Sequence, residues 1–173
     1  FLYISKYINS FFCCKHIIIT SKCPPNLNPI DKRGIIKKLD LYPSQNSFFS
    51  KIEYKNFKSI FTNEKIDIYT KLNITLITSI ADANPLIKFL EKKGNFVNHI
   101  KFADHHNYHQ QDISDILTKF NPSNSVKNII LTTEKDRVKL QKFKNEFKGI
   151  KCYVLPIEIT IDDEKKFNTQ IIR

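Results

Sequence analysis

Short apolar runs alternate with amphipathic segments along most of the 173 residues. Runs rich in β-branched residues, apolar on both faces, are typical of strands buried inside a parallel sheet. Apolar positions three and four residues apart are typical of helices that cover such a sheet. Strands are predicted at 16–20, 48–54, 73–79, 97–102, 128–132 and 152–159, and helices at 28–39, 84–93, 113–120 and 134–147. This alternation, with short connections, predicts an α/β fold: a three-layer sandwich with a mainly parallel sheet.

Local signals predict where the helices begin and end. Asn28 and Asn84 each precede a proline, which predicts an N-cap followed by the first helical residue. Gly94 and Gly149 follow the last apolar position of their helices and are predicted to end them.

The most loop-like stretch of the chain lies at 54–71. We expect a boundary between two lobes there, with one lobe at 1–60 and the other at 61–173. The polar end of the chain, at 160–173, is expected to be a frayed terminus.

The composition favours a folded globule that is a piece of a longer protein. Hydrophobic residues make up 41% of the chain and include 14 Phe, which is too apolar for a disordered tail. There is no Met, so we expect the chain to be part of something longer. No apolar run reaches the roughly 18–20 residues of a membrane-spanning helix, so any membrane contact is expected at the surface.

The net charge of +11 is compatible with nucleic acid, an anionic membrane surface or phosphorylated substrates as partners. Lys far outnumbers Arg, and the Arg clusters common in nucleic-acid readout are absent, so we interpret the charge mainly as solvated Lys. Four cysteines contain no Cys-x-x-Cys pair, which argues against a zinc site and favours reduced thiols in a cytosolic setting: Cys13, Cys14, Cys23 and Cys152.

Three polar segments follow predicted strands, where ligands gather in open parallel sheets. The first, at 102–109, holds Asp104, His105, His106 and His109 within six positions. An Asp–His neighbourhood can supply or orient a general base, or bind a metal, because His titrates near neutral pH. The alternative interpretation is a helix N-terminus with an Asp cap and surface histidines.

The second segment, at 132–139, reads Thr-Thr-Glu-Lys-Asp-Arg-Val-Lys. Helix capping by Thr132 or Thr133 explains most of it, and the functional alternative is a loop that holds substrate or braces a catalytic His. The third segment, at 78–85, places small residues before a helix, which makes either a simple turn or an anion or sugar site.

Taken in order, these segments resemble the carboxyl-terminal half of the tetraacyldisaccharide 4'-kinase family, the lipid A kinases. Each matching motif is weak alone, and together they stand in the right order and spacing across most of the chain. The matches are a strand with a Thr-Lys-Cys-Pro-like turn at 17–24, and motifs at 48–54, 79–85, 102–106, 132–139 and 154–157.

The resemblance implies transfer of the ATP γ-phosphoryl group to the 4'-hydroxyl of the tetraacyl disaccharide precursor of lipid A, with Mg²⁺ as the metal. It implies a P-loop-kinase-like fold, with 1–60 a remnant of the nucleotide-binding lobe and 61–173 the lobe that completes the cleft. The implied location is the cytoplasmic face of the bacterial inner membrane, as a peripheral protein. The implied partners are the lipid disaccharide, that membrane surface and a missing amino-terminal kinase half, and not nucleic acid.

The same resemblance assigns roles to individual residues. His105 and Asp104 are the implied catalytic residues, and His106 is the alternative to His105. The implied supports of the cleft are Asn84, Thr133, Glu134, Lys135 and Asp136, with Lys135 the candidate for meeting phosphate. No metal ligand is implied in this chain, since ATP and Mg²⁺ would be held mainly by the missing half.

The sequence departs from the family pattern in ways that bear on activity. It contains no G-x-x-x-x-G-K-[ST] phosphate loop, and it lacks the Asp-Asp pair followed by Gln-His that is expected on the metal-binding strand. This chain alone is therefore not expected to phosphorylate anything. Ser79 stands where the family motif has Gly. Two other readings stay open: a DHH-type metal-dependent phosphoesterase, and a basic nucleic-acid-binding module without catalysis.

Overall fold

The computed structural model describes residues 17–21, 23–24, 26–120 and 128–171, which form two compact units. The first unit comprises Phe1–Glu53 together with Ile157–Arg173, and the second comprises Tyr54–Pro156. This division differs from the predicted lobes at 1–60 and 61–173. The boundary lies between Glu53 and Tyr54, and the last part of the chain, Ile157–Arg173, belongs to the first unit. The identification of 1–60 as a remnant of a nucleotide-binding lobe stays a prediction.

The first unit is built on a three-stranded sheet with the order β1-β2-β9. Strand β1 pairs in parallel with β2, and the buried side chains of Cys23, Ile35 and Phe49 form the core. The elements are β1 (Ile17–Thr20), α1 (Pro29–Leu39), β2 (Asn46–Tyr54), β9 (Ile157–Ile161) and α5 (Glu164–Ile171). His16, predicted to open the first strand, lies outside the described residues.

Two details of this unit test the sequence predictions. The Asn28 side chain accepts a hydrogen bond from the Asp31 N–H, which confirms the predicted N-cap of α1. The predicted frayed terminus is wrong, because residues 164–171 form α5. The ring of Phe167 on α5 packs edge-on against Phe48 at 5.1 Å, so an apolar contact holds this polar segment to the sheet.

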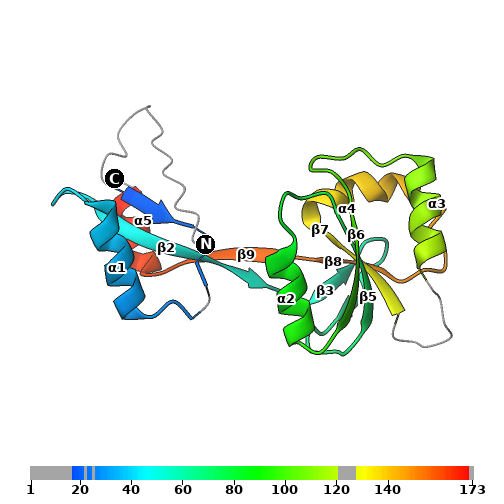
Figure 1. The fold of residues 1–173 in the computed structure, drawn as a ribbon, viewed down its shortest axis with the longest axis horizontal. Coiled ribbons are helices and arrows are strands. Elements are labelled where there is room, and N and C mark those ends of the chain that lie inside the picture. Colours follow the sequence, from blue (N-terminus) through cyan, green and yellow to red (C-terminus); the bar gives the residue numbers. More distant parts are fainter. Residues whose placement is uncertain (1–16, 22, 25, 121–127, 172–173) are drawn as a thin grey trace. The chain divides into compact units, whose positions relative to one another are not determined.

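The second unit contains a six-stranded sheet with the order β4-β3-β8-β7-β5-β6 (Figure 1). The strands β8, β7, β5 and β6 run parallel, and β3 and β4 are antiparallel additions at one edge. The strands are β3 (Phe57–Ser59), β4 (Lys65–Ile66), β5 (Asn73–Thr78), β6 (Phe96–Lys101), β7 (Asn128–Thr133) and β8 (Cys152–Leu155). The helices are α2 (Asn84–Lys92), α3 (Gln110–Lys119), α4 (Glu134–Leu140) and the 3₁₀ turn η1 (Gln141–Phe143).

Helices cover both faces of this sheet, which makes the second unit a three-layer sandwich. On one face, Leu86 and Leu90 of α2 pack against alternate strand residues such as Leu76 and Leu131. On the other face, Ile113 and Ile116 of α3 and Leu140 of α4 pack against the intervening positions, which include Ile77, Ile130 and Val154. Both faces are buried, so β5 and β7 carry Ile and Leu on both sides, as the sequence pattern predicts. The α/β fold with a mainly parallel sheet is confirmed.

Three element boundaries differ from the predictions. The single strand predicted at 152–159 is wrong, because Pro156 separates β8 from β9 and the two strands belong to different sheets. Proline lacks the N–H needed to continue a ladder, which explains the break. The helix predicted to run to 147 ends at Leu140 and continues only as the 3₁₀ turn. The N-cap of α2 is Ala83, not Asn84, and the Asn84 N–H donates instead to the Asp82 carboxylate.

Candidate functional site at the carboxyl ends of the parallel strands

The three polar segments singled out in the sequence follow β5, β6 and β7, and these strands end at the same edge of the sheet. Thr78 of β5 is level with Lys101 of β6, and Ile77 of β5 is level with Thr132 of β7. Adjacent strands β5 and β7 are followed by helices on opposite faces, α2 and α4. Their carboxyl ends are therefore a topological switch point, where ligands bind in open α/β sheets.

The carboxylate of Asp136 joins the two loops at this switch point. Asp136 lies in the first turn of α4 and is fully buried. Its Oδ2 accepts the Ser79 backbone N–H and the Thr133 hydroxyl, each at 2.9 Å, and its Oδ1 accepts the Ser79 hydroxyl. Three donors satisfy the buried charge, which would otherwise be costly to remove from water. The segments after β5 and β7 are thus fixed to one another.

Of the two predicted candidates, Thr132 and Thr133, it is Thr133 that caps α4, because its hydroxyl oxygen accepts the Asp136 N–H at 3.2 Å. Glu134 and Lys135 follow in the first turn of the helix, and both are exposed. Asn84 is exposed at the first residue of α2, and its N–H contact with Asp82 is local.

His105 lies on the loop between β6 and α3, with a left-handed backbone (φ 62°). Residues other than glycine adopt this conformation rarely, and here its N–H donates to the Ser79 carbonyl at 3.2 Å and to Asp104 Oδ1 at 3.0 Å. The His105 side chain is 77% exposed. The Nζ of Lys135 lies 3.1 Å from Asp104 Oδ1 and 3.4 Å from His105 Nε2. Three of the predicted site residues therefore form one exposed cluster.

His106 points into a different environment from its neighbour. Its side chain is 26% exposed, and its Nε2 lies 2.8 Å from Asp112 Oδ2. The ring stacks on Phe102 with centroids 4.8 Å apart and meets Tyr108 edge-on at 5.3 Å. Asp112 also accepts the His109 N–H, as part of a capping box that begins α3. His106 is bound into the protein, whereas His105 is available to a ligand.

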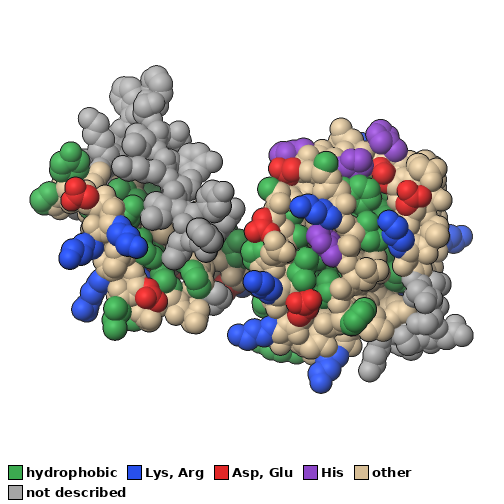
Figure 2. Space-filling model, viewed as in Figure 1, with side chains coloured by type: hydrophobic (Ala, Val, Ile, Leu, Met, Phe, Trp, Pro, Cys, Tyr) green, Lys and Arg blue, Asp and Glu red, His purple; other side chains and the backbone are tan. Residues whose placement is uncertain are grey.

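Electrostatics distinguish the acidic groups of the loop. The hydrogen bond from Lys135 is the main cause that holds the pKa of Asp104 below its ordinary value. Burial acts to raise the pKa of Asp112, but the hydrogen bonds from His106 and the His109 N–H outweigh it and lower the pKa. Both carboxyl groups are therefore ionised at neutral pH. Figure 2 shows histidine, acidic and basic side chains gathered over one part of the surface of the second unit.

Tyr108 places a polar atom behind the site. The residue is buried, and its hydroxyl faces the side chains of Ser79 and Asp136. Burial, followed by the negative charge of Asp136, raises the pKa of Tyr108. The phenol therefore stays protonated at neutral pH next to the buried carboxylate.

The sequence predictions missed two members of this site. In the sequence, Ser79 stands out only as a departure from the motif at 79–85, and Lys139 only as the last residue of the motif at 132–139. Lys139 donates to the His106 carbonyl at 2.7 Å and to the Ser79 hydroxyl oxygen at 3.4 Å. The available signal was helical spacing, since Lys135 and Lys139 are four residues apart on α4 and face the same side.

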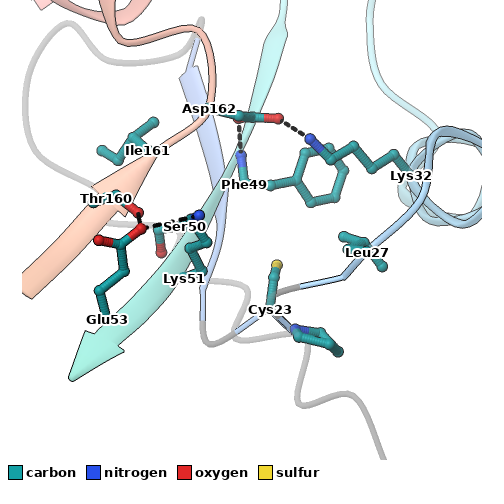
Figure 3. Close-up of a pocket in the computed structure, with 11 residues that line it drawn as sticks. Cys23, Leu27, Lys32, Phe49, Ser50, Lys51, Glu53, Thr160, Ile161 and Asp162 are labelled. Atoms are coloured by element: carbon teal, nitrogen blue, oxygen red, sulfur yellow. Dashed lines mark hydrogen bonds and ion pairs between the residues drawn. The ribbon is translucent and has the colours of Figure 1, made fainter. Parts of the chain in front are cut away.

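A separate cavity of about 340 Å³ lies in the first unit and involves none of the predicted site residues (Figure 3). Cys23, Leu27 and Phe49 form an apolar part of its wall. At its rim, the Asp162 carboxylate accepts the Phe49 N–H at 2.6 Å and a hydrogen bond from Lys32 at 2.5 Å. The ion pair joins the segment after β9 to α1, and the hydrogen bond from Phe49 joins it to β2.

The described part of the chain shows neither a metal-binding cluster nor a membrane-spanning helix. No three His, Cys, Asp or Glu side chains there are grouped so that they could hold a metal ion. None of the helices described is both long enough and apolar enough to cross a membrane.

Comparisons with known proteins agree with the order of motifs in the sequence. Residues 16–173 match the sequence model of the family described as Tetraacyldisaccharide-1-P 4'-kinase. The Tetraacyldisaccharide 4'-kinase of Bacteroides fragilis is 35% identical over 167 residues, which cover 90% of this chain and 44% of the relative. That of Bacteroides thetaiotaomicron is 35% identical over 172 residues, which cover 90% of this chain and 45% of the relative.

A solved structure supports the fold. The apo form of LpxK from Aquifex aeolicus in complex with ATP is similar to 91% of this chain, with a TM-score of 0.51 and 18% sequence identity. The similarity covers 51% of that chain.

The fold and the polar cluster define an α/β protein with a candidate ligand site at the switch point of a mainly parallel sheet. The chain belongs to the tetraacyldisaccharide 4'-kinase family, whose model matches nearly all of it. It spans about half the length of the curated relatives it matches. The phosphoesterase and nucleic-acid-binding alternatives gain no support from these matches.

Proposed function

We propose that this chain is the carboxyl-terminal part of an ATP-dependent kinase that phosphorylates the 4'-hydroxyl of the tetraacyl disaccharide precursor of lipid A. The observation that carries the proposal is family membership over residues 16–173. The cluster of Asp104, His105 and Lys135 at the carboxyl ends of the strands supports it, because phosphoryl transfer needs a positioned base and positive charge near the phosphate.

In the proposed reaction, His105 accepts the proton of the sugar hydroxyl as that oxygen attacks the γ-phosphorus of ATP. Its ring is exposed and held beside Lys135, so a substrate can reach it. Lys135 is proposed to meet a phosphate oxygen, and Asp104 orients the Lys135 ammonium. His106 does not take the proton, because its ring is bound to Asp112 and packed against Phe102.

ATP and Mg²⁺ are proposed to be held mainly by the amino-terminal half of the kinase. The described residues offer no three-residue set for a metal ion, and the sequence has no phosphate loop. ADP and the 4'-phosphorylated lipid are then the products, and ATP supplies the transferred group. The further partners proposed are the lipid disaccharide and the amino-terminal half.

We also propose a peripheral location at the cytoplasmic face of the bacterial inner membrane, where a lipid substrate would be reached. The net charge of +11 supports attraction to an anionic lipid surface. Sedimentation with vesicles of anionic and of neutral lipids tests this. We expect binding to anionic vesicles that weakens with salt. Equal binding to both types of vesicle, or binding to neither, would count against the proposed location.

The experiment for the kinase function joins this chain to its proposed partner. The chain is co-expressed with the amino-terminal half of the Bacteroides fragilis relative, and 4'-phosphorylation of the disaccharide lipid is measured. Activity should require both halves and fall about 10²- to 10⁴-fold with His105→Ala. His109→Asn is the matched control, because it removes a histidine of the same loop but keeps a capping side chain at that position. A folded complex without activity would reject the proposal.

A further inference from the structure

Ser79 is the residue at which the three loops of the site meet. Its backbone N–H and its hydroxyl both donate to the buried carboxylate of Asp136. Its carbonyl accepts the N–H of His105 at 3.2 Å. The segment after β5 therefore links the first turn of α4 to the loop that carries His105.

Lys139 connects the same three segments from the other side. Its ammonium donates to the Ser79 hydroxyl oxygen at 3.4 Å and to the His106 carbonyl at 2.7 Å. The side chain is half-buried, so its charge is partly removed from water. The Ser79 hydroxyl lies between the Lys139 ammonium and the Asp136 carboxylate, accepting from the first and donating to the second. The two opposite charges are thus bridged by one hydroxyl.

We infer that Lys139 is a positioning residue for His105, acting through the His106 carbonyl and held in place by Ser79 and Asp136. This inference rests on the proposed function, since it assigns how the proposed base is placed. Lys139 does not touch the ring of His105. It fixes the backbone immediately after that residue.

The backbone of His105 explains why such fixing is needed. Its φ of 62° is a conformation that non-glycine residues leave readily unless surrounding contacts hold them. The Ser79 carbonyl holds the N–H on one side of the residue, and Lys139 holds the carbonyl of the next residue on the other. Without the Lys139 contact, His106 keeps its N–H bond to the Ala103 carbonyl at 3.1 Å but loses the bond to its own carbonyl, and we expect the imidazole of His105 to move relative to Lys135. A displacement of about 1 Å at a reacting group can cost about 100-fold in rate.

The hydroxyl of Ser79 makes contacts that its backbone does not. The backbone N–H contacts Asp136 and the carbonyl contacts His105, and neither requires the side chain. In this chain the hydroxyl adds the bridge to Lys139. Ser79→Ala should therefore loosen Lys139 while it leaves the backbone contacts in place.

The first test measures the position of His105 in the 173-residue chain itself, by NMR of the histidine ring signals and the His105 amide. Lys139→Met removes the ammonium at similar length, Lys139→Arg restores a donor, and Lys142→Met is the matched control on the exposed 3₁₀ turn. We expect the His105 signals to shift and its amide to exchange faster in Lys139→Met, and to return toward wild type in Lys139→Arg. His105 signals unchanged in Lys139→Met, or moved equally in Lys142→Met, would overturn the inference.

Ser79→Ala is the second variant, in case Lys139→Met does not fold. Its control is Ser59→Ala, which also removes a buried hydroxyl, one that accepts the Thr62 N–H elsewhere in the second unit. The same displacement of the His105 signals is expected for Ser79→Ala alone. Unchanged signals would again overturn the inference.

The second test uses the co-expressed halves described above. Lys139→Met should lower kcat about 10- to 100-fold with KM for the lipid changed less than about threefold, and Lys139→Arg should recover most of the rate. A normal kcat in Lys139→Met would reject the positioning role even if the NMR signals move. If the wild-type halves show no activity at all, the proposed function fails, and the NMR result still decides whether Lys139 positions His105.

Discussion

The Nζ of Lys135 lies 3.4 Å from Nε2 of His105, although 30 positions separate the two residues in the sequence. The same ammonium donates to Asp104 Oδ1 at 3.1 Å, so the first turn of α4 and the loop after β6 form one exposed polar surface. All three side chains are at least 40% exposed. Their value to the protein is therefore expected in ligand binding more than in stability.

Replacing Lys135 should distinguish a role in ligand binding from a role in stability. Exposed ion pairs contribute about 0.2–1 kcal/mol, so Lys135→Ala is expected to change the free energy of unfolding by less than about 1 kcal/mol. In the co-expressed halves, the same variant should lower kcat/KM at least about tenfold, because it removes positive charge at the proposed phosphate position. Urea unfolding and the phosphorylation assay measure the two quantities, with Lys142→Ala as the control. A large loss of stability would show that Lys135 is structural.

Substitutions of the two neighbouring histidines should change the free energy of unfolding by different amounts. His106→Ala removes the contact with Asp112 and the packing on Phe102, and should lower the free energy of unfolding by about 1–3 kcal/mol. His105→Ala should change it by less than about 0.5 kcal/mol, because the ring is 77% exposed. Urea unfolding of both variants measures the difference. Equal losses of stability would mean that the two rings have similar surroundings.

The buried carboxylate of Asp136 should be among the most sensitive positions of the second unit. Asp136→Asn replaces an acceptor oxygen with an NH₂ group that faces donors from Ser79 and Thr133. Removing the charge of one partner in such a buried network lowers the free energy of unfolding by about 3–5 kcal/mol. Denaturant unfolding measures the loss, and Asp115→Asn on the exposed face of α3 is the control. A loss below about 1 kcal/mol would contradict the hydrogen-bond network described here.

His99 should make stability depend on pH. Burial, and then the charge of Lys101, lower its pKa below the ordinary value of 6.5, and its Nε2 lies 2.9 Å from the Thr78 hydroxyl. The folded state thus binds fewer protons than the unfolded state just below pH 6.5. The contribution of neutral His99 is present above that pH and is lost as the pH falls toward the folded-state pKa. His99→Gln should flatten the fall of the unfolding free energy between pH 7 and pH 5; identical slopes would argue against this.

Cys152 should resist thiol reagents while the protein is folded. The residue is 3% exposed, and burial raises the pKa of its thiol to about 12, so the reactive thiolate is scarce at pH 8. Labelling with iodoacetamide, followed by mass spectrometry of the peptide that holds Cys152, should be at least about 100-fold slower in buffer than in urea. Comparable rates in buffer and in urea would show that β8, which begins at Cys152, separates easily from β7.

The apolar pattern predicted the fold because both faces of the central sheet are covered. A buried parallel strand carries apolar side chains on both faces, and β5 and β7 show this with adjacent Ile and Leu residues. Local chemistry also predicted what it controls: Asn28 caps α1 and Thr133 caps α4 through contacts three residues away. The order of the motifs also indicated the family, because that order is a property of the linear sequence and needs no knowledge of tertiary contacts.

Predictions that depended on long-range contacts fared less well. Whether Pro156 only bends a strand or separates two sheets depends on what lies beside each half. Residues 164–171 are polar enough in sequence to suggest a frayed end. In the structure they form a helix whose Phe167 ring packs against the ring of Phe48. His105 and His106 look equivalent in the sequence, and only their surroundings distinguish them.

The sequence by itself determined the alternating strands and helices, the caps of α1 and α4, and the candidate segments at the ends of three strands. These follow from periodicity and from contacts within about four residues, which each segment carries with it. Only the tertiary structure decided that Ser79, Asp136 and Lys139 form one network around the His105 loop. Its closing contacts join residues 57 and 60 positions apart, and strand order, not sequence, brings those residues together.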